Sequence, residues 1–130
     1  MTKKEEKKLM KKLEKECKAL CSKITKHLWD NSCAMCGKAG SNAHHFFGWK
    51  ACSSTRFVLD NLVWLCYACH IHKVHQQGLT EPIRARIIER IGQEEFDEMY
   101  RLAFTVCEYT TEALEKRKAE LLDIISENKI

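Results

Sequence analysis

The sequence predicts a mostly helical α+β protein in which a small metal-supported unit lies between helical segments. Three observations predict this class: amphipathic stretches at both ends of the 130-residue chain, a central stretch rich in cysteine, histidine and glycine, and two Cys-x-x-Cys pairs within it. A chain of this length typically forms one domain, so we expect a single domain over residues 1–130. It contains no apolar run as long as a membrane span, and we expect no membrane association.

The first expected element is a basic amphipathic helix over residues 3–29. Apolar residues recur there at steps of three or four, while lysine and glutamate cover the other faces. The net charge is +5 over residues 1–30, +3 over residues 31–79 and −4 over residues 80–130. A polyanion would therefore be attracted to the first two thirds of the chain. The lysines either form a solvated face with intrahelical Glu–Lys pairs or contact a DNA backbone, and both readings stay open.

Residues 31–79 contain a predicted structural zinc site. Two pairs, Cys33-Ala-Met-Cys36 and Cys66-Tyr-Ala-Cys69, are separated by 29 residues. Zinc prefers four ligands in a tetrahedron, and each pair supplies two thiolates. Cytosolic thiols are kept reduced, so metal binding explains the eight cysteines better than disulfides do. The separation exceeds that of simple zinc ribbons, which indicates an inserted element.

The insertion should contain short strands on both sides of a turn near Gly48, and a helix should start around Cys66 to Cys69. Three aromatic residues, Trp49, Phe57 and Trp64, are expected to pack a small core.

Neighbouring side chains on a strand point to opposite faces. Phe46 and Phe47 should therefore divide, one entering the core and the other exposed.

Three helical segments are expected after residue 79. Thr80 caps the first, which Gly92 closes; the second covers residues 93–108; Thr110 or Thr111 caps the third. Their apolar residues are Phe96, Met99, Tyr100, Phe104 and Cys107 on the second, and Leu114, Leu121, Leu122 and Ile125 on the third. These faces can pack against the first helix within one chain or between two, so a homodimer through the N- and C-terminal helices stays open.

The remaining cysteines lack a clear ligand pattern. Cys17 and Cys21 stand four residues apart on the apolar face of the first helix, a spacing that can bind metal but more commonly marks buried thiols. Cys52 and Cys107 have no partner at ligand spacing and are expected to be core or spare thiols.

Four residues inside the insertion resemble a known motif. His44-His45, Asn61 and His70 are similar to the HNH motif of ββα-metal nucleases, and the stretch AHHFFGWKACSSTRFVLDNLVWLCYACHIHK resembles the NinG/Rap-like phage recombination nucleases. IGQEEFDEMYRLA resembles the C-terminal helical segment of that family, so the resemblance covers about residues 31–125. It implies a zinc-stapled ββα-metal (HNH) finger flanked by an N-terminal helix and C-terminal helices.

The resemblance also implies an activity and a role for each residue. The expected activity is metal-dependent hydrolysis of DNA phosphodiester bonds, leaving 5′-phosphate ends, on duplex or branched recombination intermediates. His44 and His70 would bind the catalytic divalent metal, His45 would be the general base, and Asn61 would position it.

The metal would be Mg²⁺ or Mn²⁺, with Ni²⁺ or Zn²⁺ as alternatives because His44 stands where aspartate is common. One helical turn after His70 comes Val74, which cannot bind a metal, so a further role for His72 or His75 stays open.

Candidate DNA contacts are Arg56, Lys50, Lys73 and His75. Arg56 can either bind phosphate or pair with Asp60. The expected location is the cytoplasm, that of the bacterial host if the protein is phage-encoded. Two alternatives to a nuclease stay open: a non-catalytic, zinc-stabilised nucleic-acid-binding module, and a zinc-stabilised helical interaction protein.

Overall fold

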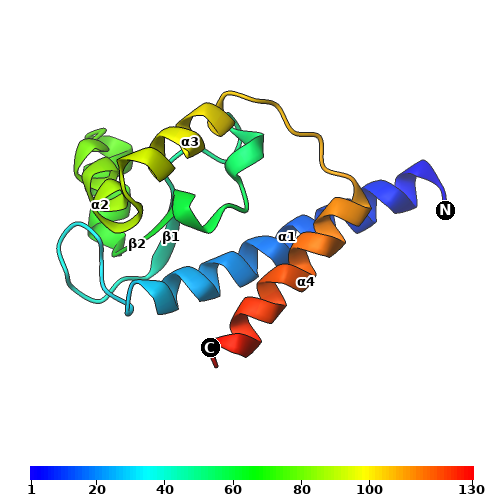
Figure 1. Cartoon of the computed structure of the whole chain (residues 1–130), viewed down its shortest axis with the longest axis horizontal. Coiled ribbons are helices and arrows are strands. Elements are labelled where there is room, and N and C mark those ends of the chain that lie inside the picture. The colour runs from blue at the N-terminus through cyan, green and yellow to red at the C-terminus, as the bar shows by residue number, and fades with distance from the viewer.

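The computed structural model describes residues 1–130 and shows a mostly helical α+β protein with one two-stranded antiparallel sheet (Figure 1). The fold class is confirmed at this level. In chain order the elements are α1 (Lys3–Leu28), β1 (Asn42–His45), two 3₁₀ turns η1 (Ser53–Thr55) and η2 (Leu59–Asn61), β2 (Leu62–Leu65), the π-helix η3 (Ala68–Gln76), α2 (Glu81–Ile91), α3 (Gln93–Ala103) and α4 (Thr111–Glu127). None of these helices combines the length and the apolar character that crossing a membrane requires.

The first and last helices lie side by side within one chain (Figure 1). Side-chain oxygens cap both: Thr2 accepts from the Glu5 N–H at the start of α1, and Thr110 accepts from the Ala113 N–H at the start of α4. The buried face of α4 fills the space over the apolar stripe of α1 and consists of Leu114 and Leu121, both 0% exposed. Of the two predicted pairings, the structure therefore shows the intrachain one.

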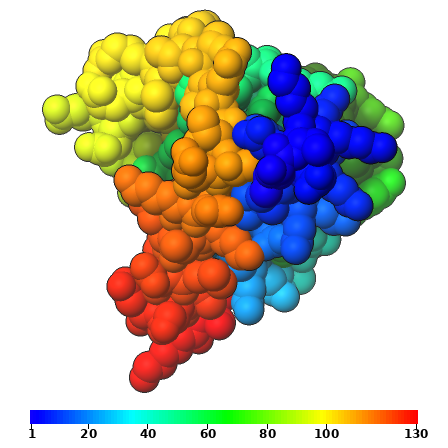
Figure 2. Space-filling view, turned by 90° about the vertical axis from the view of Figure 1, so that its right-hand side faces the viewer, coloured from blue at the N-terminus to red at the C-terminus, as the bar shows by residue number.

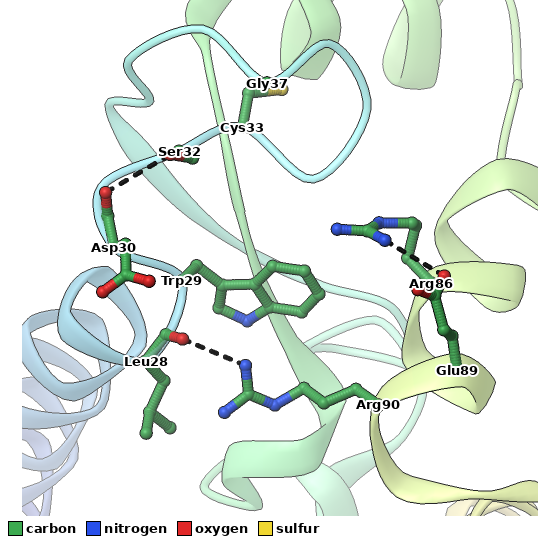
Figure 3. Close-up of a pocket in the computed structure, with 9 residues that line it drawn as sticks. All are labelled: Leu28, Trp29, Asp30, Ser32, Cys33, Gly37, Arg86, Glu89 and Arg90. Atoms are coloured by element: carbon green, nitrogen blue, oxygen red, sulfur yellow. Dashed lines mark hydrogen bonds and ion pairs between the residues drawn. The ribbon is translucent and has the colours of Figure 1, made fainter.

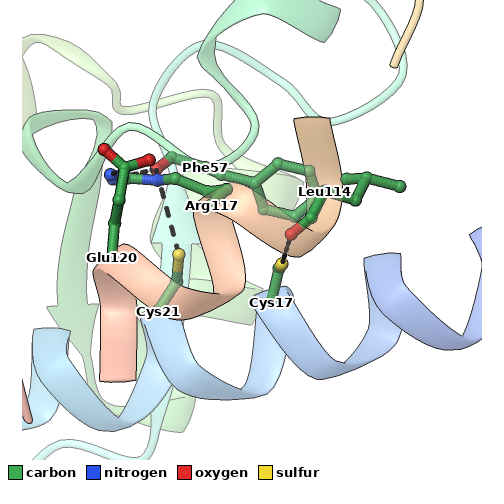
Figure 4. Close-up of polar contacts among 6 residues, drawn as sticks. All are labelled: Cys17, Cys21, Phe57, Leu114, Arg117 and Glu120. Atoms are coloured by element: carbon green, nitrogen blue, oxygen red, sulfur yellow. Dashed lines mark hydrogen bonds and ion pairs between the residues drawn. The ribbon is translucent and has the colours of Figure 1, made fainter. Parts of the chain in front are cut away.

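The carbonyl of Phe57 ties both helices to the central unit (Figure 4). It accepts hydrogen bonds from Arg117 of α4, at 3.1 Å from Nε and 2.6 Å from Nη2, and from the Cys21 thiol of α1 at 4.0 Å. Cys17 donates to the carbonyl of Leu114. Burial raises the pKa of Cys21 to about 12 and also raises that of Cys17. Both residues are buried thiols, as the sequence favoured.

The sheet separates two hydrophobic clusters. β1 pairs with β2 so that Asn42 faces Leu65 and His45 faces Leu62. Successive residues of β2 serve different clusters: Val63 and Leu65 pack with α2 and α3, whereas Leu62 packs with α1 and α4. This division places β1 between the two halves of the molecule.

The prediction that three aromatic residues pack a core in the central unit is confirmed in part. Phe57 and Trp64 are buried, and Trp49 is half-buried against the α1–α4 cluster. The prediction that Phe46 and Phe47 divide between core and solvent was wrong. Strand β1 ends at His45, so the alternation of a strand does not extend to them, and both rings contact Phe96 of α3.

Helix α3 ends earlier in the chain than the sequence predicted. The second C-terminal helix stops at Ala103 instead of residue 108, and Phe104 is 72% exposed. Residues after it leave the helix because they bond to η1: Cys107 N–H donates to Ser53 Oγ, and the Tyr109 hydroxyl donates to the Ser53 carbonyl. Leu122 of α4 also departs from its predicted packing role, with 45% of its surface exposed.

Two adjacent leucines of α4 provide a test of the α1–α4 packing. Leu121→Ala removes a fully buried side chain and should lower the free energy of unfolding by about 2–5 kcal/mol. Leu122→Ala, a control at the exposed neighbouring position, should cost less than about 1 kcal/mol. Urea denaturation followed by circular dichroism measures both, and equal losses in the two variants would contradict the packing of Leu121 between α1 and α4.

Candidate metal and nuclease site

Four cysteine sulfurs converge at one end of the sheet. The Sγ atoms of Cys33, Cys36, Cys66 and Cys69 all lie within 4.8 Å of one another, the arrangement that a tetrahedral zinc site needs. The first pair sits in the loop after α1, where Gly37 adopts a φ of +77° that favours glycine. In the second pair, Cys66 directly follows β2 and Cys69 lies in the first turn of η3. These four cysteines could hold a structural zinc, as the sequence predicted.

The protonation of these thiols is unequal in the protein without metal. Burial raises the pKa of Cys33, but the backbone N–H groups around it outweigh burial and lower that pKa to about 7. Burial and the neighbouring thiols raise the pKa of Cys69 to about 12. A bound cation would favour the thiolate form of all four.

Three histidines form a second group of candidate metal ligands. The ring nitrogens of His44 on β1 and of His70 and His75 on η3 lie within 4.8 Å of one another. The Nε2 atoms of His70 and His75 are 3.0 Å apart, and the His44 ring centroid lies 5.2 Å and 5.6 Å from theirs. His44 is buried, whereas His75 is exposed, so the group opens to solvent on the η3 side.

The π-helical geometry of η3 decides which histidines meet. An α-helix would bring residue 74 beside His70, and that residue is Val74, which is buried in the core. A π-helix has a longer turn and brings residues five positions apart together, so His75 lies beside His70. His72 points elsewhere and bonds to Gln76. The sequence left the roles of His72 and His75 open because, in the expected α-helix, neither residue would lie beside His70.

The three histidines fit a divalent cation by the chemistry of their donor atoms. Burial, followed by the charges of His70 and His75, lowers the pKa of His44 to about 4. Burial and then His75 also lower the pKa of His70. A neutral imidazole has a lone pair for a metal, and these shifts keep both rings neutral at pH 7.

His45, the predicted general base, lies on the opposite face of β1 from His44. Its Nε2 is 2.9 Å from the backbone carbonyl of Arg56. A carbonyl only accepts, so Nε2 carries the proton and Nδ1 keeps its lone pair. Burial lowers the pKa of His45, and its ring packs edge-on against Trp49, with 5.4 Å between the centroids.

Asn61 is fully buried and holds the chain that leaves β1. Its Oδ1 accepts from the Phe47 N–H at 2.7 Å, and its Nδ2 donates to the carbonyls of Phe47 and Thr55. Its own backbone carbonyl accepts from the Phe46 N–H at 2.9 Å. Both ends of the side chain are therefore used to fix residues 46–47 immediately after His45.

The four residues predicted to contact DNA differ in their exposure and in the groups that they contact. Arg56 donates through Nε to the Trp49 carbonyl at 2.6 Å, with its guanidinium 5.1 Å from the Trp49 ring centre, and the predicted alternative of a pair with Asp60 is absent. Lys50 and Lys73 are exposed. His75 belongs to the histidine group. The role of the Arg56 carbonyl could not be found from sequence, because any residue at that position would provide one.

A separate pocket of about 440 Å³ lies where α1, the first cysteine loop and α2 meet (Figure 3). Arg86 and Arg90 of α2 flank the Trp29 ring, and Arg90 also donates to the Leu28 carbonyl at the end of α1. This contact satisfies a free carbonyl of the helix terminus and joins α1 to α2. None of the three clustered histidines lines this pocket.

The chain matches a known protein family. A family model described as "Bacteriophage Lambda NinG protein" matches residues 1–129, nearly the whole chain. Neither a curated protein nor a solved structure matches significantly.

The cysteine group predicts how the protein depends on metal. Purified protein should hold one cobalt or zinc ion through thiolates, with the sulfur-to-cobalt absorption bands as the readout. Cys36→Ser should weaken these bands and lower the affinity for cobalt, because three thiolates remain of four; Cys36 is exposed, so this change leaves no cavity in the core. Cys52→Ser lies outside the group and serves as the control. Unchanged bands in Cys36→Ser would rule out its predicted role as a ligand.

Proposed function

We propose that this chain, which belongs to the family of bacteriophage Lambda NinG proteins, is a metal-dependent DNA endonuclease of the HNH type. One observation carries the proposal. Adjacent residues of β1 present a histidine to a three-imidazole group on one face and a histidine with a free Nδ1 on the other. The chain order of strand, strand and helix around these residues also supports an HNH finger.

His44, His70 and His75 would hold the divalent cation. When bound, the cation would stabilise negative charge on the phosphate and on the departing 3′ oxygen. The donor set consists of imidazoles alone, which suits transition metals better than Mg²⁺. We therefore favour Mn²⁺, Ni²⁺ or Zn²⁺ over Mg²⁺ as the catalytic ion.

His45 would take a proton from the attacking water through Nδ1. The Arg56 carbonyl holds the proton on Nε2 and fixes the orientation of the ring. Its lowered pKa keeps His45 unprotonated at neutral pH, the state in which it can act as a base. Attack in line with the 3′ oxygen would leave a 5′-phosphate and a 3′-hydroxyl.

Asn61 would act as a positioning residue. Its three side-chain hydrogen bonds fix residues 46–47 and the turn at Thr55, and thereby the strand end that carries His45. We further propose that branched recombination intermediates are substrates, which rests on the resemblance to phage recombination nucleases and not on a shape seen in the site.

A non-catalytic, zinc-stabilised DNA-binding module is the second candidate. The net charge of +5 over residues 1–30 favours binding to DNA whether or not cleavage follows. One measurement distinguishes the two candidates: a binding module would not cleave DNA, whichever divalent cation is added.

Replacing the base should separate catalysis from folding. His45→Ala should lower the rate of DNA cleavage by about 10²–10⁴-fold, because it removes the group proposed to accept the proton. Cleavage of labelled duplex, flap and four-way DNA with Mn²⁺, Ni²⁺, Zn²⁺ and Mg²⁺ measures this effect. The variant should keep its thiolate-bound metal and its helix content. Full activity in His45→Ala would exclude this residue as the base.

Replacing His75 and replacing His72, both on η3, should have different effects on the metal requirement of cleavage. His75→Ala should raise the metal concentration needed for half-maximal cleavage about tenfold or more, because it removes one ligand of three. His72→Ala, an exposed histidine on the same helix, is the matched control and should leave this concentration unchanged. If the two variants require the same metal concentration, His75 is not a ligand.

A further inference from the structure

A cleft of about 330 Å³ joins α1 to the proposed catalytic residues. Its walls come from α1, β1, the start of β2 and η3, and include His45 and His70. Two α1 residues, Lys18 and Ser22, also line it. No carboxylate is among the residues that line the cleft, so its polar groups suit an anion.

Lys18 lies next to the proposed base. Its Nζ is 4.8 Å from the centre of the Trp49 ring, and the same ring lies 5.4 Å from that of His45. The ammonium group and the imidazole thus both contact the Trp49 ring, and both residues line the cleft. A phosphate in the cleft could reach Lys18 and the catalytic residues at the same time.

Lys18 is also the last member of a row of lysines along α1. Residues three or four positions apart lie on one face of an α-helix, and five exposed lysines follow this spacing: Lys4, Lys8, Lys11, Lys15 and Lys18. At 100° per residue they fall within a sector of about 80°. Every glutamate of α1 lies outside this sector. The row runs about 21 Å along the helix.

The row is accessible for most of its length. Each of its five members is exposed, and Figure 2 shows the first turns of α1 (dark blue) at the surface. The buried stripe that packs against α4 lies on a different face, so the row takes no part in the α1–α4 interface.

We propose that α1 is the DNA-guiding element of this protein: the lysine row binds the phosphate backbone of one strand and leads it to the cleft, where Lys18 and Ser22 hold a phosphate beside His45. The occupant is a nucleic-acid strand because the row and the cleft together offer one sign of charge along a line. This inference rests on the proposed nuclease function, since that function gives the strand its destination.

Two neighbouring lysines provide a matched test. Lys11 belongs to the row, whereas Lys12, about 100° from Lys11 around the same helix, lies outside the sector of the row and is also exposed. Binding of a fluorescent 20-nucleotide DNA, free and in duplex, is measured by anisotropy without divalent cations other than the structural zinc. Lys11→Met and Lys18→Met should each weaken binding about fivefold and reduce the slope of log affinity against log salt by about 1.

Lys12→Met should change affinity less than about twofold. Lys18→Arg, which keeps the charge, should restore binding and cleavage that Lys18→Met loses. Circular dichroism should show the same helix content in all variants, because these side chains are exposed.

Equal losses of DNA affinity in Lys11→Met and Lys12→Met would refute binding by the lysine row. Wild-type affinity in Lys18→Met would refute the proposal that the bound strand reaches the cleft. The binding assay needs no turnover. Absence of cleavage by the wild-type protein would therefore refute the proposed nuclease without being mistaken for failure of the lysine row.

Discussion

The convergence of four cysteine sulfurs is the constraint on which the rest of this structure depends. Only 24 of the 130 residues are buried, and two clusters of ten and eight of them lie on opposite sides of a sheet of two four-residue strands. Such a small sheet is not stable alone. A metal bound by the cysteines would join the loop after α1 to the start of η3, and would thereby fix both ends of the hairpin that carries the histidines.

A strand gives two adjacent histidines different environments. On β1, His44 faces η3 and is nearly enclosed, whereas His45 faces Trp49 and the carbonyl of Arg56. Their adjacency therefore allows two roles, because successive side chains of a strand point to opposite faces. Asn61 fixes the chain where the strand ends, which keeps the two faces in register with the helix that follows.

The outer helices are part of the same arrangement. Arg117 of α4 and Cys21 of α1 both bond to the Phe57 carbonyl, in the segment that also contains Arg56 and η2. This contact places α1 along one wall of the cleft beside His45. The basic helix and the histidine-bearing unit thus form one surface, although the sequence presents them as separate segments.

The sequence by itself determined the features that depend on local spacing. The four candidate cysteine ligands, the apolar stripe of α1, the cap at Thr110 and the general fold class follow from periodicity and turn chemistry, which act over a few residues. Only the tertiary structure decided that His75 joins His44 and His70. Val74 is held in the core, and the longer turn of a π-helix brings His75 round to the face of His70. It also decided that α3 ends at Ala103, because the residues that follow bond to η1, about fifty positions earlier in the chain. Contacts of this kind leave no periodic signal, since they depend on which segments meet after folding.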